Sequence, residues 1–137
     1  MSGTSSPPAK TIRVVAALIE RDRKYLITQR RATAVLPLLW EFPGGRVEEG
    51  ETDAGALHRE VLHRLGVDVK IGQFISFVRH AYEHYVVDLH LYECTLETGE
   101  LRALAVSDFR WVRSDEMDQY NFTPADEASM SKLLGED

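Results

Sequence analysis

The stretch from residue 52 to residue 66 constrains the sequence most, because it carries the signals for both ends of one helix. The hydroxyl of Thr52 can accept from the first free amides of a helix, and Asp53 adds a negative charge where the helix dipole favours one. Gly66 suits the left-handed residue that closes a helix. These signals predict a helix over Asp53–Leu65, about 20 Å long at ~1.5 Å per residue.

One side of the predicted helix is apolar. Leu57, Val61 and Leu65 recur every four residues, and Ala54 falls near the same stripe. Apolar residues at this spacing are typical of a helix that packs one face on a core. We therefore expect this side to face the interior.

A second side of the helix, and the loop before it, are rich in charged residues. Glu60, His63 and Arg64 share that side at spacings of three and four residues. Hard cations such as Mg²⁺ take oxygen ligands and are commonly completed by substrate phosphates. A carboxylate-rich loop followed by a glutamate on the helix therefore indicates a divalent-metal site. The loop carboxylates are Glu48, Glu49 and Glu51.

Length and charge limit the classes of protein to consider. The 137 residues suit one domain, which we place at residues 11–137 after a flexible N-terminal tail over residues 1–10. The net charge of −6 argues against a nucleic-acid polymer or an anionic membrane as partner. A single cysteine rules out an internal disulfide framework, and no apolar run is long enough for a membrane span. We expect a cytoplasmic protein.

Strand-like segments lie on both sides of the predicted helix. They are β-branched and apolar, and Val87, Leu89 and Leu91 alternate along one of them. A Pro-Gly-Gly turn is expected at residues 43–45, and a final helix beginning with proline at residues 124–134. Such an order predicts an α/β fold with a mixed sheet between helices. The expected strands cover residues 11–20, 24–30, 67–80, 85–96 and 108–113.

The spacing of residues around the helix resembles the Nudix box. A glycine, a glutamate, an Arg-Glu pair and a closing glycine follow the pattern G-x5-E-x7-R-E, here as Gly45, Glu51, Arg59, Glu60, Val61, Gly66 and Val67. The segments VVAALIERDRKYLITQRR, WEFPGG and FTPADEASMSKLL resemble the MutT-like branch of that family. The resemblance runs from about Ile12 to Leu134 and implies a Nudix-type α/β/α sandwich with a mixed β-sheet.

This resemblance also implies an activity and its residues. Nudix hydrolases of this branch cleave the pyrophosphate linkage of an ordinary or modified nucleoside triphosphate with Mg²⁺ or Mn²⁺. It implies Glu60, Glu51 and the Gly44 carbonyl as metal ligands, Glu60 and Glu51 as catalytic groups, and Arg59 as the residue that orients the loop carboxylates. For Glu60 the alternative is a surface ion pair with Arg64 that contributes only about 0.3 kcal/mol.

His63 and Arg64 stand where the family has two adjacent glutamates. Imidazole suits Mg²⁺ poorly, and a guanidinium cannot lose its proton. At ~4 Å and an effective dielectric of ~20, each unit-charge contact is worth about 4 kcal/mol, so a guanidinium there opposes a metal ion. Arg64 would swing outward, pair with Glu60 or bind phosphate itself. Another family ligand position, six residues before Trp111, is Ala105, so we expect weakened hydrolysis.

The resemblance implies further residues for the phosphates. Arg30 would contact a substrate phosphate, which a guanidinium can bind through two parallel hydrogen bonds. Arg64 is the second candidate for phosphate binding. The alternative for Arg30 and Arg31 is a pair of solvated arginines at a strand end.

Four residues are implied at the base of the nucleotide. Tyr82 would stack on the base, a contact worth about 1–3 kcal/mol, and Asp126 would read the base edge. The alternative for Asp126 is a cap or a charge at the start of the final helix. An ionised carboxylate only accepts, so it would prefer a base that presents an amine or the N–H of an oxidised purine. Phe42 and Glu41 would shape the same pocket.

Three functions therefore stay open. The first is metal-dependent nucleotide hydrolysis, with a nucleotide as the small-molecule partner and a homodimer among the assemblies that the resemblance implies. The second is a catalytically impaired Nudix domain that binds a nucleotide as a sensor or partner-binding module. The third is an interaction protein that kept only the fold. Nucleotide binding without turnover would distinguish the second from the first.

Overall fold

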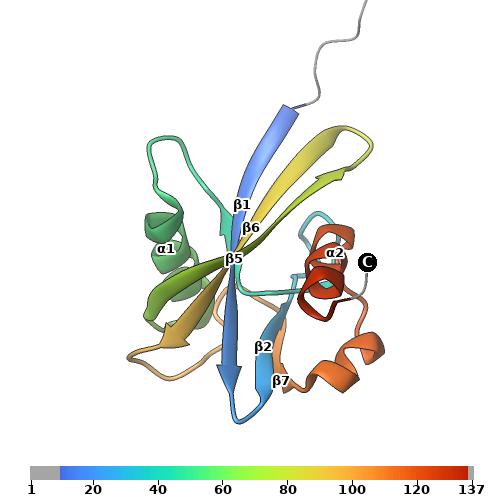
Figure 1. Ribbon diagram of the computed structural model, residues 1–137. Helices are drawn as coiled ribbons and strands as arrows, with labels where there is room; N and C mark the ends of the chain where they lie inside the picture. Colours follow the sequence, from blue (N-terminus) through green and yellow to red (C-terminus); the bar gives the residue numbers. More distant parts are fainter. Residues whose placement is uncertain (1–9, 136–137) are drawn as a thin grey trace, which may run out of the picture.

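The computed structural model describes residues 10–135 and has one mixed sheet of seven strands (Figure 1). The tail predicted over residues 1–10 therefore lies outside the described residues except for Lys10, which begins a strand. The elements are β1 Lys10–Arg21, β2 Lys24–Gln29, β3 Trp40–Glu41, β4 Gly44–Arg46, α1 Asp53–Leu65, β5 Val69–Ala81, β6 Tyr85–Leu96, β7 Asp108–Val112, the 3₁₀ helix η1 Ser114–Gln119 and α2 Pro124–Leu133.

The strand order is β3-β2-β1-β6-β5, with β4 paired to β1 and β7 paired to β2. Strands β1 and β6 run parallel from the pair Lys10 and Tyr85 to the pair Ile19 and Cys94. The pairings β1–β2, β1–β4, β2–β3, β2–β7 and β5–β6 are antiparallel. The predicted mixed sheet is confirmed.

Strand β1 is the centre of the molecule because it is buried on both faces. Its side chains alternate between two apolar cores, with Val15 and Ala17 on the side of α1, and Ala16 and Leu18 on the side of α2. Figure 1 shows α1 and α2 on opposite sides of the sheet. The expected α/β/α sandwich is therefore confirmed.

Both ends of α1 are as the sequence predicts. The Thr52 hydroxyl accepts from the Gly55 amide at 3.0 Å. Gly66 has a φ of 73° and its amide donates to the Leu62 carbonyl at 2.9 Å. A left-handed glycine at this position satisfies a carbonyl that the helix would otherwise leave free.

The apolar side of α1 differs from the prediction at one residue. Leu57, Val61 and Leu65 are fully buried as expected, but Ala54 is exposed and Ala56 is buried in its place. The prediction for Ala54 was wrong because Ala54 lies outside the buried face of α1. The buried residues of the helix are Ala56, Leu57, Glu60, Val61 and Leu65.

The segment predicted as a glycine turn is a strand. In β4, Gly44 lies opposite Ala16 and Gly45 lies opposite Val15, so β4 is an edge segment on β1. A Cβ at Gly44 would lie 2.0 Å from the Val15 carbonyl oxygen. The chain can approach β1 this closely only because residue 44 has no side chain. The 3₁₀ helix η1 was not predicted from the sequence.

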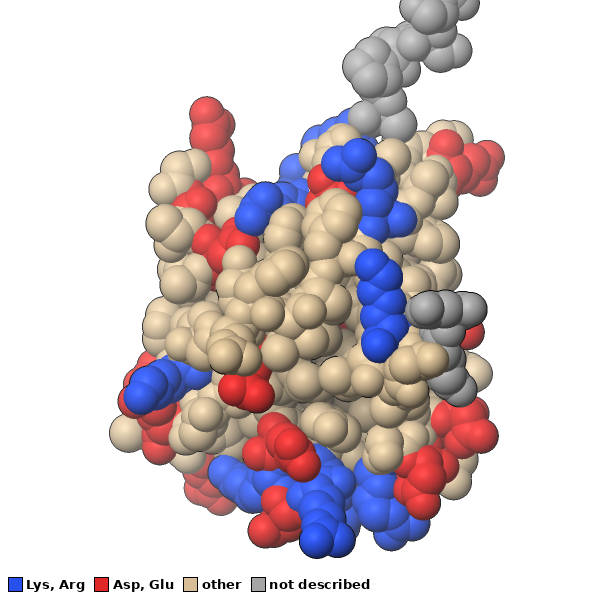
Figure 2. All heavy atoms as spheres, viewed as in Figure 1, with Lys and Arg blue, Asp and Glu red and all other residues tan. Residues whose placement is uncertain are grey.

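The face over β5 and β6 is mostly uncharged in Figure 2, and charged side chains of both signs gather along its lower edge. Two aromatic side chains of β5 are among the exposed apolar residues, Phe74 at 52% and Phe77 at 37% exposure. None of the helices described within residues 10–135 is long and apolar enough to cross a membrane.

The close approach of β4 to β1 predicts a measurable difference between two glycines. Gly44→Ala should lower the free energy of unfolding by about 3 kcal/mol, because the new methyl overlaps the β1 backbone. Gly50→Ala should cost only about 1 kcal/mol, because residue 50 has positive φ but no atom within 4 Å of an added Cβ. Urea unfolding followed by tryptophan fluorescence measures both. Equal midpoints would contradict the predicted overlap.

Candidate active site

Arg59 ties the loop before α1 to the helix itself. Its Nε and Nη2 donate to the two oxygens of Glu51 at 2.7 and 2.8 Å, and Nη2 also donates to the Arg46 carbonyl at 2.9 Å. The hydrogen bonds from Arg59 lower the pKa of Glu51 to about 2. Glu51 is thus held ionised at neutral pH, and the loop is fixed against α1. The catalytic and metal roles expected for Arg59 and Glu51 stay predictions.

Glu60 is the buried carboxylate of α1, with 7% exposure. A Cβ at Gly45 would lie 1.5 Å from its Oε2, so the backbone of β4 packs directly on the carboxylate. Oε1 accepts from Arg59 at 3.1 Å, and Oε2 accepts from Arg64 at 3.2 Å. Of the alternatives for Arg64, the structure therefore shows the ion pair with Glu60.

Arg64 also faces a second carboxylate. Its Nη1 lies 3.6 Å from the Glu41 Oε2, and Arg30 donates to Glu41 Oε1 at 3.1 Å from the other side. Arg30 is half-buried and its Nε donates to the Val35 carbonyl, so Arg30 is not a freely solvated side chain. The result is a row of alternating charges. Its members are Arg30, Glu41, Arg64, Glu60, Arg59 and Glu51.

These residues do not fit a divalent ion as they are arranged. Within residues 10–135, no group of three or more His, Cys, Asp and Glu side chains is placed to hold a metal. Each oxygen of Glu60 accepts from an arginine, whose positive charge opposes a cation there, and Ala105 brings no ligand to the same place. Mg²⁺ would have to displace Arg64 before it could bind Glu60. Metal binding by Glu60, Glu51 and Gly44 stays a prediction.

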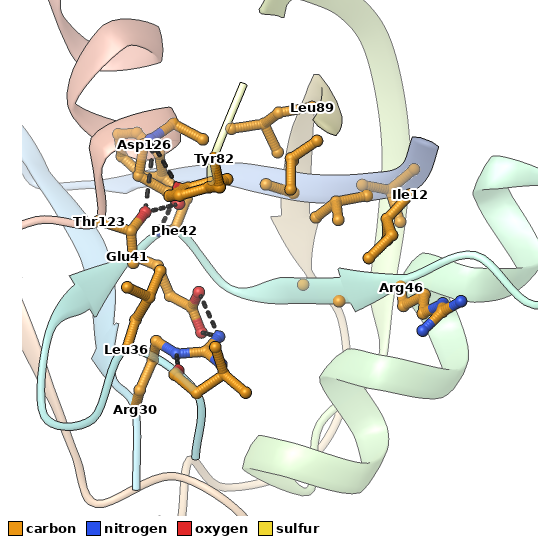
Figure 3. A pocket seen from close by; sticks show the side chains of 18 of the residues that line it. Ile12, Arg30, Leu36, Glu41, Phe42, Arg46, Tyr82, Leu89, Thr123 and Asp126 are labelled. Atoms are coloured by element: carbon orange, nitrogen blue, oxygen red, sulfur yellow. Dashed lines mark hydrogen bonds and ion pairs between the residues drawn. The ribbon is translucent and has the colours of Figure 1, made fainter. Parts of the chain in front are cut away.

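A cavity of about 360 Å³ contains the four residues expected around the base. It lies beside β1 and β6, the β3–β4 segment and the start of α2. Figure 3 shows Asp126, Thr123, Tyr82 and Phe42 gathered at one end, with Glu41 and Arg30 below them. The structure thus brings the predicted base residues together with the predicted phosphate residue Arg30.

Asp126 is held firmly at the start of α2. Its Oδ1 accepts from the Phe42 amide at 3.0 Å, and its Oδ2 accepts from the Thr123 hydroxyl at 2.5 Å. Burial, with help from the nearby Glu41 carboxylate, raises the pKa of Asp126 to about 7. A carboxylate oxygen has two lone pairs, so each oxygen keeps one for a ligand. The helix is capped by Thr123, not by the Asp126 side chain.

Glu41 and Tyr82 complete the cavity wall. Burial raises the pKa of Glu41, although Arg30 and Arg64 oppose the change. The ring of Tyr82 stacks on Tyr85 with centroids 5.0 Å apart and planes at 22°, and its hydroxyl accepts from the Ala125 amide at 3.2 Å. The half-buried ring of Tyr82 is therefore fixed in orientation at the cavity wall, and its stacking on a base stays a prediction.

A second cavity of about 260 Å³ adjoins the first and shares Arg30 and Arg64 with it. Its remaining walls are His63 and Glu60 from α1, Arg31 and Ala34 after β2, and Ala105 before β7. The sequence correctly placed Ala105 near Glu60, since both line this cavity.

Sequence reasoning missed several wall residues. Tyr85 and Arg46 line the first cavity, and Thr123 both caps α2 and binds Asp126. A threonine followed by proline at residues 123–124 was a readable cap signal for the final helix. Tyr85 and Arg46 carried no local signal, because only the pairing of distant strands brings them to the cavity.

Comparison with known proteins assigns the family. The model of the NUDIX domain matches residues 14–132. The chain belongs to the Nudix hydrolase family. A CTP pyrophosphohydrolase of Escherichia coli K12 is 37% identical over 117 residues, which cover 85% of this chain and 87% of that protein. A putative 8-oxo-dGTP diphosphatase 2 of Mycobacterium tuberculosis H37Rv is 32% identical over 127 residues, covering 88% and 86%.

Solved Nudix structures support the same assignment. The solution structure of the Escherichia coli ORF135 protein matches with a TM-score of 0.79 and 33% identity over 95% of this chain and 94% of that one. A MutT protein of the Nudix hydrolase family from methicillin-resistant Staphylococcus aureus 252 matches with a TM-score of 0.73 and 36% identity, covering 95% and 100%. The MutT-like resemblance inferred from the sequence is confirmed.

The buried Asp126 predicts a pH-dependent stability. Because its folded pKa is about 7 and its ordinary value is near 3.8, its contribution is fully present below about pH 4 and is lost as pH rises through 7. Asp126→Asn should therefore gain stability relative to the natural chain as pH rises from 4 to 7, by roughly 1 kcal/mol for each pH unit. Urea unfolding across this range measures the difference. A constant difference would refute the raised pKa.

Proposed function

We propose that this Nudix protein hydrolyses a nucleoside triphosphate to a monophosphate and pyrophosphate, at a rate lowered by His63 and Arg64. The observation that carries the proposal is the base-sized cavity of Tyr82 and Asp126, which opens onto the loop and helix of the Nudix box through Arg30. In the reaction a water oxygen attacks a phosphorus and a P–O–P bond breaks, with the displaced phosphate oxygen taking the electron pair.

The first cavity suits a base that presents a hydrogen-bond donor. When Asp126 and Glu41 are ionised they can only accept, so an exocyclic amine or the N–H of an oxidised purine complements them in that state. Cytosine has such an amine and 8-oxoguanine has both groups, which fits the CTP and 8-oxo-dGTP activities named for the two relatives. We propose a substrate base of this kind, stacked on Tyr82.

The lowered rate follows from the ion pairs of Glu60. A carboxylate that already accepts from Arg59 and Arg64 is a poor ligand for Mg²⁺ or Mn²⁺. Breaking the contact with Arg64 costs free energy before any ion can bind. His63 and Arg64 would thus act mainly on the metal-binding side of the reaction, although Arg64 also borders the base cavity through Glu41.

The same ion pair favours a second candidate function. With Glu60 occupied and the base cavity intact, the domain would bind a nucleotide without turnover, as a sensor or partner-binding module. Both candidates share the nucleotide site, and they differ in whether the P–O–P bond is broken.

The base-stacking role of Tyr82 can be tested by two substitutions. Tyr82→Leu should raise KM for the nucleotide about tenfold, because stacking of about 1–3 kcal/mol is lost. Tyr82→Phe keeps the ring and loses only the hydrogen bond to the Ala125 amide, so its KM should stay near the natural value. Steady-state kinetics with a nucleotide panel measures both. If the two variants weaken binding equally, stacking is not the contact that matters.

The effect of His63 and Arg64 on turnover can be tested by placing at these positions the two glutamates that the family has there. The double change His63→Glu and Arg64→Glu should raise turnover at least tenfold in Mg²⁺ or Mn²⁺, which is about 1.4 kcal/mol of barrier. Phosphate and pyrophosphate release from a nucleotide panel measures it.

A matched control makes the same change in charge at two residues that line neither cavity. His58→Glu with Arg110→Glu, both exposed residues, should leave turnover unchanged. An unchanged rate in the box variant as well would show that residues 63 and 64 do not limit hydrolysis.

A further inference from the structure

We propose that the second cavity binds a polyphosphate chain directly through arginines, without a divalent metal ion. This inference rests on the proposed nucleotide site and concerns only how its phosphates are held. Three arginines stand against a single glutamate among the residues that line this cavity, Arg30, Arg31, Ala34, Glu60, His63, Arg64 and Ala105.

The charge balance of the cavity suits an anion. Glu60 is balanced by Arg59 and Arg64, and Glu41 is balanced by Arg30 and Arg64, so no carboxylate beside the cavity is left unpaired to repel phosphate. Arg31 is exposed and pairs with no carboxylate of residues 10–135, and its Nη2 donates to the Leu104 carbonyl at 2.8 Å. Guanidinium groups bind phosphate through two parallel, charge-assisted hydrogen bonds. The wall thus offers positive charge where a metal site would offer negative charge.

One N–H donor of Arg64, at Nε, has no hydrogen-bond partner among the described residues. This Nε is buried, whereas Nη1 and Nη2 of the same side chain face Glu41 and Glu60. A buried donor without a partner is uncommon and marks the place of a water, an ion or a ligand. Solvent does not reach this Nε in the present arrangement, so a phosphate oxygen could accept from it only after the Arg64 side chain turned toward the second cavity.

The position of the cavity fits the rest of a nucleotide. Arg30 and Arg64 border both cavities. A nucleotide whose base lies against Tyr82 in the first cavity would therefore extend its phosphates past these arginines into the second. The wall opposite α1 is also fixed, because the amides of Leu104 and Ala105 donate to the Arg64 carbonyl at 3.0 and 3.1 Å. The cavity is preformed and needs no metal ion to assemble it.

The test uses inorganic tripolyphosphate, which has no base. Isothermal titration of the full chain in EDTA should show binding, and added Mg²⁺ should leave it unchanged or weaken it, because the ion and the arginines compete for the same oxygens. Arg64→Met should weaken binding at least tenfold. Binding seen only with Mg²⁺, or no binding in either buffer, would overturn the proposal.

Two further variants keep the test independent of the fold around Glu60. Arg31→Met breaks no ion pair of the described residues, so its expected loss of binding, about threefold or more, reports on the phosphate alone. Arg110→Met removes an exposed arginine that lines neither cavity and should bind like the natural chain. If Arg31→Met and Arg110→Met behave alike and both bind fully, the cavity is not the phosphate site.

Two outcomes distinguish the metal-independent phosphate site from the proposed hydrolysis. Tight tripolyphosphate binding in EDTA without nucleotide turnover would support the cavity and reject hydrolysis. Turnover that is accompanied by strictly Mg²⁺-dependent tripolyphosphate binding would support hydrolysis and overturn the metal-independent site.

Discussion

The contact of the Glu60 carboxylate with Gly45, Arg59 and Arg64 is the interaction on which the site depends. The bare backbone of β4 lets the carboxylate lie against the sheet, and the two arginines balance its charge in a place where it is almost fully buried. An unpaired carboxylate at this depth would be costly, so in the absence of Arg64 another positive charge, such as a divalent ion, would have to balance Glu60.

Most of the scaffold was predictable because its signals are local. The cap at Thr52, the left-handed Gly66 and the apolar repeat of α1 each depend on neighbours within a few residues. The strand character of β4 was not predictable, since Gly44 and Gly45 favour a turn by themselves and become a strand only when they approach β1. The site divides in the same way. The family resemblance predicted its members, whereas the ion pair of Arg64 with Glu41 could be seen only in the packed structure.

The two cavities offer a ligand different hydrogen-bonding groups. At the end near α2 a buried carboxyl group, Asp126, can accept from a ligand donor when it is ionised. At the end near α1 a set of arginines can donate to a ligand acceptor. A molecule with donors on one end and acidic oxygens on the other, which is the general form of a nucleotide, matches both ends at once.

The loop before β7 is fastened to the main chain of residue 64, through the amides of Leu104 and Ala105. The anchor is a carbonyl that every amino acid possesses. The side chain at residue 64 can therefore change from acidic to basic while these backbone hydrogen bonds hold the loop in place. The charge of the site can thus change sign without a change in the fold. A lineage could pass between metal-assisted and arginine-assisted phosphate binding by altering residues 63 and 64 alone, on an unchanged backbone.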